Sequence, residues 1–170
     1  MARRAILEYP DPRLRLQSEP VADFDADLSH LADDLIETLH ATGGIGLAAP
    51  QVDDRRRVLV MDHSGDASAP RVYVNPVILA DAAPGLVEES CLSLPGLVGN
   101  VIRATQVRVQ AQKRDGTRFE HDLTGMEAVC LQHEIDHLDG RLFLDRLSLL
   151  RRLRARMAAR SRSLRGSDAA

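Results

Sequence analysis

The stretch Gln132-His133-Glu134-Ile135-Asp136-His137-Leu138-Asp139-Gly140 contains the pattern H-E-x-x-H. Residues four apart on a helix share a face, so His133 and His137 can bind one metal ion, and Glu134 can reach a water molecule at that ion. Upstream, Thr124-Gly125-Met126-Glu127 matches a capping box that starts a helix, and Gly140 suits the helix end. The sequence therefore predicts a metal-binding helix between Thr124 and Gly140.

Two histidines do not complete a catalytic metal site, which needs a third protein ligand. In one class of metalloprotease the motif continues to a third histidine, but Phe143 occupies that position here. A downstream glutamate is also missing, and Asp145, which follows the helix end closely, stays open as a candidate. Cys130 lies seven residues before His137, about 10 Å along a helix, which is difficult for a shared ion. Cys91, on a separate segment, can approach from across the site.

A second notable segment is Gly43-Gly44-Ile45-Gly46-Leu47-Ala48-Ala49-Pro50-Gln51. Its three glycines and two alanines leave the backbone bare, so a ligand or another strand can approach closely. The spacing does not match a dinucleotide-binding fingerprint, and no βαβ unit surrounds it. A tight turn explains this segment about as well as a binding site does.

The remaining elements follow from hydrophobic periodicity. A helix is predicted from Asp25 to Thr42, because leucines recur at helical spacing and Gly43 follows. Strands are predicted at 57–62 and 71–79, and a hairpin joins strands 107–113 and 117–122 through Asp115-Gly116. A basic helix is predicted at about 148–161, with an apolar side formed by four residues. These are Leu149, Leu150, Leu153 and Met157.

Composition sets broader limits on the protein. The chain has 170 residues, of which 44% are hydrophobic and 28% charged, as expected for one soluble globular domain over residues 1–165 with a flexible tail at 166–170. The net charge of −3 gives no general reason to expect DNA binding, although eight arginines lie between Arg146 and Arg165. No transmembrane run or apolar signal sequence is visible, and two cysteines fit a reducing compartment. We expect a cytoplasmic protein without a membrane partner.

Three segments together resemble the signature motifs of the peptide deformylase family, in the same order. They are Gly44-Ile45-Gly46-Leu47-Ala48-Ala49-Pro50-Gln51, Glu89-Ser90-Cys91-Leu92-Ser93 and Gln132-His133-Glu134-Ile135-Asp136-His137. Spacing and length also match, so the resemblance covers essentially the whole chain. It implies a hydrolase of protein biosynthesis that removes the formyl group from the N-terminal formylmethionine of newly made polypeptides and releases formate. It also implies an α+β fold, with antiparallel sheets around the metal-binding helix and a helix near each terminus.

The resemblance further implies that Cys91, His133 and His137 bind one divalent metal ion, with water at the fourth position. The family usually employs Fe²⁺, and Zn²⁺, Ni²⁺ or Co²⁺ can substitute. The metal would lower the pKa of its water, and Glu134 would accept the proton of that water and deliver it to the leaving amine. The Gln51 side-chain amide and the Leu92 backbone N–H would stabilise the oxyanion.

Substrate contacts are also implied by the resemblance. The segment containing Ile45 and Gly46 would pair with an extended substrate as an added strand. An apolar pocket would receive the methionine side chain, with four lining residues. These are Ile45, Met126, Val129 and Cys130. In the family, the C-terminal helix can contact the ribosome, and the arginines near the C-terminus of this chain are consistent with such a contact.

One departure from the family pattern is Ser90, which stands where the family usually has glycine before the metal-binding cysteine. We expect Ser90 to lie beside the substrate, and the fold and ligands to tolerate it. An alternative reading is a catalytically weakened deformylase-like protein that binds formylated peptide N-termini. Retention of Gln51, Cys91, Glu134 and both histidines argues against this alternative. A general metalloprotease is disfavoured by Phe143 and by the missing downstream glutamate.

Overall fold

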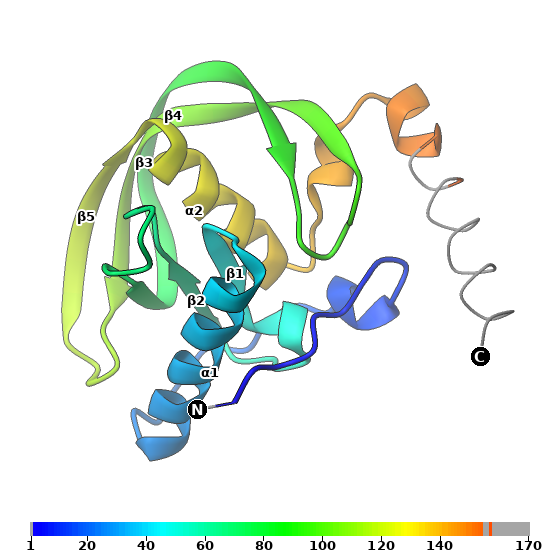
Figure 1. Ribbon diagram of the computed structural model, residues 1–170. Helices are drawn as coiled ribbons and strands as arrows, with labels where there is room; N and C mark the ends of the chain where they lie inside the picture. Colours follow the sequence, from blue (N-terminus) through cyan, green and yellow to red (C-terminus); the bar gives the residue numbers. More distant parts are fainter. Residues whose placement is uncertain (1, 155–156, 158–170) are drawn as a thin grey trace, which may run out of the picture.

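The computed structural model describes residues 2–154 and 157. Five strands form one antiparallel sheet in sequential order, and two α-helices pack with it (Figure 1). The strands are β1 (Gly46–Ala48), β2 (Val58–Met61), β3 (Arg71–Ser90), β4 (Val98–Gln112) and β5 (Arg118–Thr124). The α-helices are α1 (Ala26–Thr42) and α2 (Gly125–Leu138), and the short 3₁₀ helices are η1 (Pro12–Arg15), η2 (Ala49–Val52) and η3 (Phe143–Arg146). The predicted α+β class is confirmed.

Helix α1 agrees with its prediction to within one residue at its start. Asp25 is the N-cap, and its carboxylate accepts a 2.9 Å hydrogen bond from the Leu28 N–H. Gly43 ends the helix in the left-handed conformation, with φ of 67°. The leucines that recur along the helix are fully buried and pack against β1 and β2. Helix α1 therefore packs on β1 and β2, and the glycine-rich segment follows directly from its C-terminal end.

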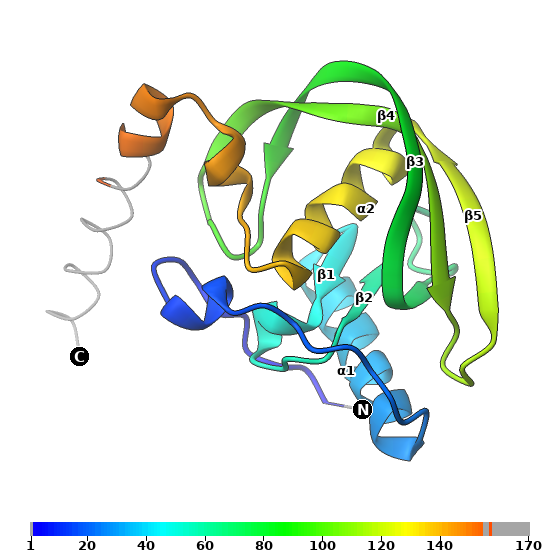
Figure 2. The same ribbon diagram turned by 180° about the vertical axis from the view of Figure 1, so that it is seen from behind.

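Strands β3 and β4 are much longer than the predicted strands at 71–79 and 107–113. The prediction stopped early because Pro84 and Gly85 lie in the middle of β3, and because the pairing of β3 with β4 contains register shifts near Val74 and Ile78. The resulting ribbon arches over α2 (Figure 2), so its far end reaches the other side of that helix. This bend brings Glu89 and Arg103 beside α2, as their side-chain contacts with that helix show.

The hairpin between β4 and β5 forms as predicted, and Gly116 has a φ of 83° in its turn. The predicted capping box at the start of α2 is wrong, because the Thr124 side chain makes no capping hydrogen bond. Gly125 explains the difference, since its φ of 57° turns the chain sharply from β5 into the helix. The helix itself runs through the H-E-x-x-H motif, as predicted.

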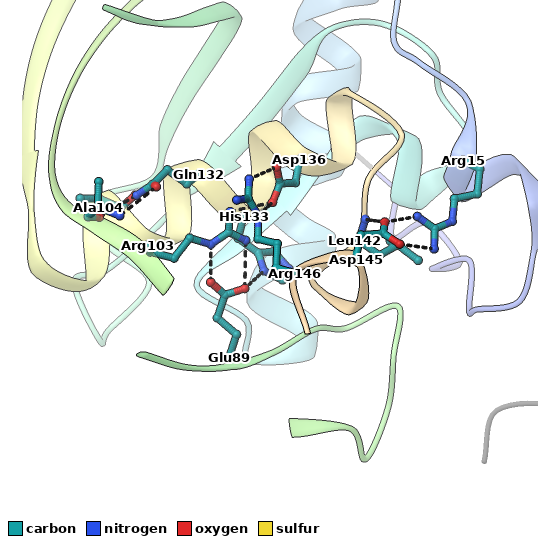
Figure 3. Close-up of polar contacts among 11 residues, drawn as sticks. Arg15, Glu89, Arg103, Ala104, Gln132, His133, Asp136, Leu142, Asp145 and Arg146 are labelled. Carbon is teal, nitrogen blue, oxygen red and sulfur yellow. Dashed lines mark hydrogen bonds and ion pairs between the residues drawn. The ribbon is translucent and has the colours of Figure 1, made fainter. Parts of the chain in front are cut away.

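Helix α2 is buried from Ala128 to Leu138 except at Gln132, which is half-buried. The Gln132 side-chain amide donates to the Ala104 carbonyl at 2.7 Å and accepts from the Ala104 N–H at 3.2 Å (Figure 3). This reciprocal pair ties the middle of α2 to β4. Polar side chains inside such a helix must find partners, because an unpaired buried polar group is costly. Gln132, His133 and Asp136 of the motif each have such a partner, which fixes their orientation.

The C-terminal part of the described chain is helical, but the leucines predicted to form its apolar side are not packed against the rest of the protein. Residues 149–154 and 157 are helical, whereas Ser148, the predicted start, is not. The other positions of the predicted helix at 148–161 and the tail at 166–170 lie outside the described residues. Leu149, Leu150 and Leu153 are exposed. None of the helices in the described part of the chain is both long and apolar enough to cross a membrane.

Candidate metal centre

Cys91, His133 and His137 bring their ligand atoms together although they come from two distant segments. One atom of each residue lies within 4.8 Å of the other two, and the Cys91 Sγ is 3.2 Å from the His137 Nε2. Cys91 follows the end of β3, whereas both histidines project from α2. A thiol and two imidazoles are ligands that Zn²⁺, Fe²⁺ and Co²⁺ accept. These three residues fit a divalent metal ion.

The second nitrogen of His133 has a carboxylate partner. The His133 Nδ1 lies 2.7 Å from the Glu89 Oε2, and both side chains are buried. Burial raises the pKa of Glu89, but the hydrogen bonds from His133 and Arg103 outweigh it and hold that pKa at about 2. An ionised carboxylate can only accept, so Nδ1 carries a proton and Nε2 is the ring nitrogen left to bind a metal. This is the arrangement that orients metal-binding histidines in proteins.

Glu89 belongs to a larger buried ion-pair network, which Figure 3 shows. The Arg103 guanidinium donates to Glu89 at 2.6 and 3.1 Å and to the Asp136 carboxylate at 2.6 Å. Arg146, on η3, donates two further hydrogen bonds to Asp136 at 2.6 and 2.7 Å. The network thus runs from His133 through β3, β4 and α2 to η3.

Glu134 lies beside the metal ligands with one free oxygen. Its side chain is buried, and its Oε2 has no hydrogen-bond partner among the described residues. Burial raises the pKa of Glu134 to about 7. A carboxylate whose pKa lies near neutrality is suited to take up and release a proton at physiological pH. The orphaned oxygen is what we expect of a base that awaits a water molecule or a substrate.

Gly46 explains why Glu134 can lie where it does. A Cβ atom at this position would be 2.6 Å from the Glu134 Oε1 and 2.6 Å from the Cys130 Sγ. Such distances do not occur for real Cβ atoms, so a side chain here would displace one of the two groups. The glycine-rich segment is therefore a close approach of β1 to α2 rather than a turn alone.

Gln51 is oriented by two hydrogen bonds. Its Oε1 accepts from the Ala48 N–H at 2.8 Å, and its Nε2 donates to the Ser93 Oγ at 3.1 Å. The same Nε2 lies 3.8 Å from the Cys91 Sγ. The amide N–H₂ therefore points toward the cluster of metal-ligating residues.

A cavity of about 410 Å³ opens onto this cluster. Ile45, Gly46, Ser90 and Leu92, four of the predicted site residues, line it together with Gln51, Cys91, His133 and Glu134. Residues 94–98 also line this cavity. The lining carries no cationic side chain apart from the histidine, so the cavity offers a largely neutral and apolar surface around the polar cluster.

Met126, Val129 and Cys130, which were predicted to line a methionine pocket, are not among the residues around this cavity. Met126 is exposed on the first turn of α2, whereas Val129 and Cys130 are buried. Cys130 lies behind Gly46, and burial raises its pKa well above the ordinary value. A role for these three residues in holding the methionine side chain stays a prediction.

The competing third ligands make other contacts. Phe143 stacks on the His133 ring with a centroid distance of 6.1 Å. Asp145 pairs with Arg15 and accepts a 3.0 Å hydrogen bond from the Leu142 N–H (Figure 3). Neither residue belongs to the cluster that offers ligand atoms. Of these candidate third ligands, Cys91 is the one that lies in a cluster with both histidines among the described residues.

Glu89, Arg103 and Asp136 are parts of the site that were not predicted from the sequence. A pattern in the sequence could have identified Arg103. It occupies an inward-facing position in the alternation of β4, between Val101 and Val107. An arginine at such a position requires buried carboxylates. Glu89 stands two residues before Cys91, but the sequence does not show that the strand bends toward α2.

Comparisons with known proteins agree with this geometry. The model of the family described as polypeptide deformylase matches residues 3–153. A curated peptide deformylase from Hahella chejuensis is 48% identical over 157 residues, which cover 92% of this chain and 94% of the relative. One from Pseudomonas aeruginosa is 49% identical over 158 residues, with the same two coverages.

Solved structures give the same result. The crystal structure of a peptide deformylase from Legionella pneumophila superposes with a TM-score of 0.92 at 43% identity, and the match covers 98% of each chain. A peptide deformylase from Ehrlichia chaffeensis in complex with actinonin superposes with a TM-score of 0.90 at 36% identity. That match covers 95% of this chain and 98% of the other.

Proposed function

The chain belongs to the polypeptide deformylase family, and we propose on that basis that it removes the formyl group from the N-terminal formylmethionine of newly made polypeptides. It is an enzyme, a hydrolase of protein biosynthesis whose products are formate and a peptide with a free N-terminal amine. The observation that carries this conclusion is the cluster of Cys91, His133 and His137, beside a cavity that Cys91, His133 and Glu134 line.

We propose Cys91, His133 and His137 as the ligands of one divalent metal ion, with Fe²⁺ as the ion in the cell. When bound, the ion would polarise the formyl oxygen and lower the pKa of a water molecule. The contact between His133 and Glu89 supports this assignment, because it holds the imidazole in the tautomer that a metal requires. Burial lowers the pKa of His137, and the positive charge of Arg103 acts in the same direction, which keeps that imidazole neutral.

Glu134 is the proposed acid–base residue. Its carboxylate would accept a proton from the attacking water as the C–O bond to the formyl carbon forms. The protonated Glu134 would then deliver that proton to the amine nitrogen as the C–N bond breaks, so that formate leaves. The pKa of about 7 and the unpaired Oε2 support both steps. The Gln51 amide and the Leu92 N–H are the proposed donors to the oxyanion.

The substrate is proposed to lie as an extended strand beside the segment Ile45–Gly46, as peptides often do at an exposed sheet edge. Ile45 is 42% exposed at the rim of the cavity, and Gly46 brings the backbone close to Glu134. Ser90 lines the same cavity next to Cys91, where it would contact the backbone of the substrate.

The deciding experiment is formate release from formyl-Met-Ala-Ser by protein purified without oxygen and loaded with Fe²⁺ or Co²⁺. We expect stoichiometric formate and free amine. Well-folded, metal-loaded protein that bound the peptide without releasing formate would instead support the alternative, a weakened deformylase-like protein that only binds formylated N-termini. The retained Glu134 and Gln51 disfavour that alternative.

The proposal also covers the location of the enzyme, the extent of its catalytic domain and a proposed partner. We propose that it acts in the cytoplasm, that residues 1–165 form one catalytic domain, and that the basic C-terminal helix contacts the ribosome. The exposed positions of Arg151 and Arg154 support the last part. Co-sedimentation with ribosomes should fall when residues after Leu147 are removed, and unchanged co-sedimentation would contradict the contact.

A further inference from the structure

We propose that Arg146 is a positioning residue of the metal centre. By neutralising Asp136, it would leave the Arg103 guanidinium available to hold Glu89 against His133. This inference rests on the proposed function, because it concerns the same metal ligands. Arg146 touches none of the reacting groups and would act through three other side chains.

The contacts form one continuous line from the surface to the metal ligand. Arg146 donates to both oxygens of Asp136, Arg103 donates to Asp136 and to both oxygens of Glu89, and Glu89 accepts from His133 (Figure 3). The side chains of Arg103, Glu89 and Asp136 are 0%, 4% and 5% exposed, whereas that of Arg146 is 40% exposed. Arg146 is thus the solvent-facing end of the network.

Arg146 matters because it makes the number of positive charges in the network equal to the number of negative charges. The network contains two carboxylates, Glu89 and Asp136, and two guanidinium groups, Arg103 and Arg146. Without Arg146, two buried carboxylates would share one cation, and Asp136 would compete with Glu89 for Arg103. In a medium of low dielectric constant this competition is strong, because water cannot compensate the unpaired charge. The bidentate contact that orients Glu89 toward His133 would weaken.

The position of Arg146 is set by its neighbours on η3. Asp145 pairs with Arg15 of η1 and with Arg152 at 3.2 Å, and it caps the Leu142 N–H. Phe143, one turn earlier, packs on the His133 ring. The short helix therefore contacts His133 in two ways, through Phe143 directly and through Arg146 by way of the ion pairs. An experiment must separate these two routes.

The experiment measures the affinity for Co²⁺ by titration of the protein after chelation, followed through the thiolate-to-cobalt absorption band. We expect Arg146→Met to lower the affinity about tenfold, the lower end of the range for residues that support metal ligands. The double variant Asp136→Asn with Arg146→Met removes one charge of each sign and should recover wild-type affinity to within about threefold. Asp136→Asn alone should also bind like the wild type, since it removes the competitor of Glu89.

Arg108→Met is the matched control. Arg108 forms an equally bidentate pair with Asp122, at 2.7 and 3.0 Å, but on the exposed face of β4 and β5. Its loss should leave the Co²⁺ affinity unchanged. Circular dichroism and the melting temperature establish that each variant is folded. If Arg146→Met does not fold, a loss of Co²⁺ affinity in Asp136→Asn would still contradict the proposed competition for Arg103.

Three other results would each contradict a specific part of this proposal. Equal affinity of Arg146→Met and the wild type would refute the role of Arg146 while leaving the metal centre intact. A double variant as weak as Arg146→Met would show that Arg146 acts by placing η3 and Phe143, not by charge. A wild-type protein without the thiolate band would remove the metal centre itself, and with it this inference.

Discussion

The Nδ1 atom of His133 lies 2.7 Å from a carboxylate oxygen of Glu89, a residue 44 positions earlier in the chain. Glu89 is in turn held by Arg103, so the imidazole is oriented by a buried ion pair and not by its helix alone. A histidine fixed in this way presents Nε2 in a constant direction. We therefore expect the proposed metal centre to depend on Glu89 and Arg103, which are not among its ligands.

Glu89→Gln tests this dependence. The amide would retain the shape of Glu89 but lose its charge, so we expect metal affinity to fall by about 10- to 100-fold. Removing one partner of a buried ion pair should also lower the free energy of unfolding by about 3 kcal/mol. Competition with a chromophoric chelator measures the first effect, and urea unfolding measures the second. Glu88→Gln, an exposed neighbour on the other face of β3, is the control and should change neither.

Glu134→Gln tests the acid–base role. The glutamine can still fill the space beside Gly46, but it cannot accept a proton, so kcat should fall by about 10²- to 10⁴-fold. Metal content, measured by elemental analysis, should be unchanged because Glu134 is not a proposed ligand. A variant that kept its metal and turned over normally would refute the assignment of Glu134 as the base.

The raised pKa of Glu134 also predicts how stability depends on pH. Its value of about 7 in the folded protein lies above the ordinary 4.5, so folding favours the protonated form. The ionised carboxylate lowers the free energy of unfolding. This effect is absent below pH 4.5 and grows as pH rises toward 7. After chelation, Glu134→Gln should therefore be more stable than the wild type at pH 8, by roughly 1–3 kcal/mol, and equal to it at pH 4. Urea unfolding at both pH values provides the measurement.

Ser90→Gly tests the departure from the family pattern. Ser90 is paired with Val98 at the end of β3, and it is not among the residues with positive φ. Its backbone therefore does not need glycine, and we expect metal affinity and melting temperature to stay the same. Because Ser90 lines the cavity and would contact the substrate, KM for formyl-Met-Ala-Ser should rise by about two- to tenfold, as expected for the loss of one hydrogen bond. A larger change in kcat would show that the serine affects turnover.

Local sequence determined a good part of this protein. The leucine spacing and Gly43 define α1, Asp115-Gly116 defines the hairpin, and H-E-x-x-H places two imidazoles on one face of α2. These features depend on neighbours within a few residues, so a pattern in the chain is enough to predict them. Resemblance to a family added Cys91, Gln51 and Leu92 as expectations, since nothing in their local sequence joins them to the histidines.

Only the tertiary structure decided how the site is held. The bend of β3 and β4 over α2 brings Glu89 and Arg103 to His133 and Asp136, and register shifts within a strand pair leave no periodic signal that predicts such a bend. The same holds for Arg146, which stands just before the predicted basic helix at 148–161 and has no local signal that it pairs with a buried carboxylate. Burial raises the pKa of Glu134, and burial is a property of the packed molecule and not of the residue. The sequence shows which side chains are charged, but only long-range packing determines which of them form ion pairs.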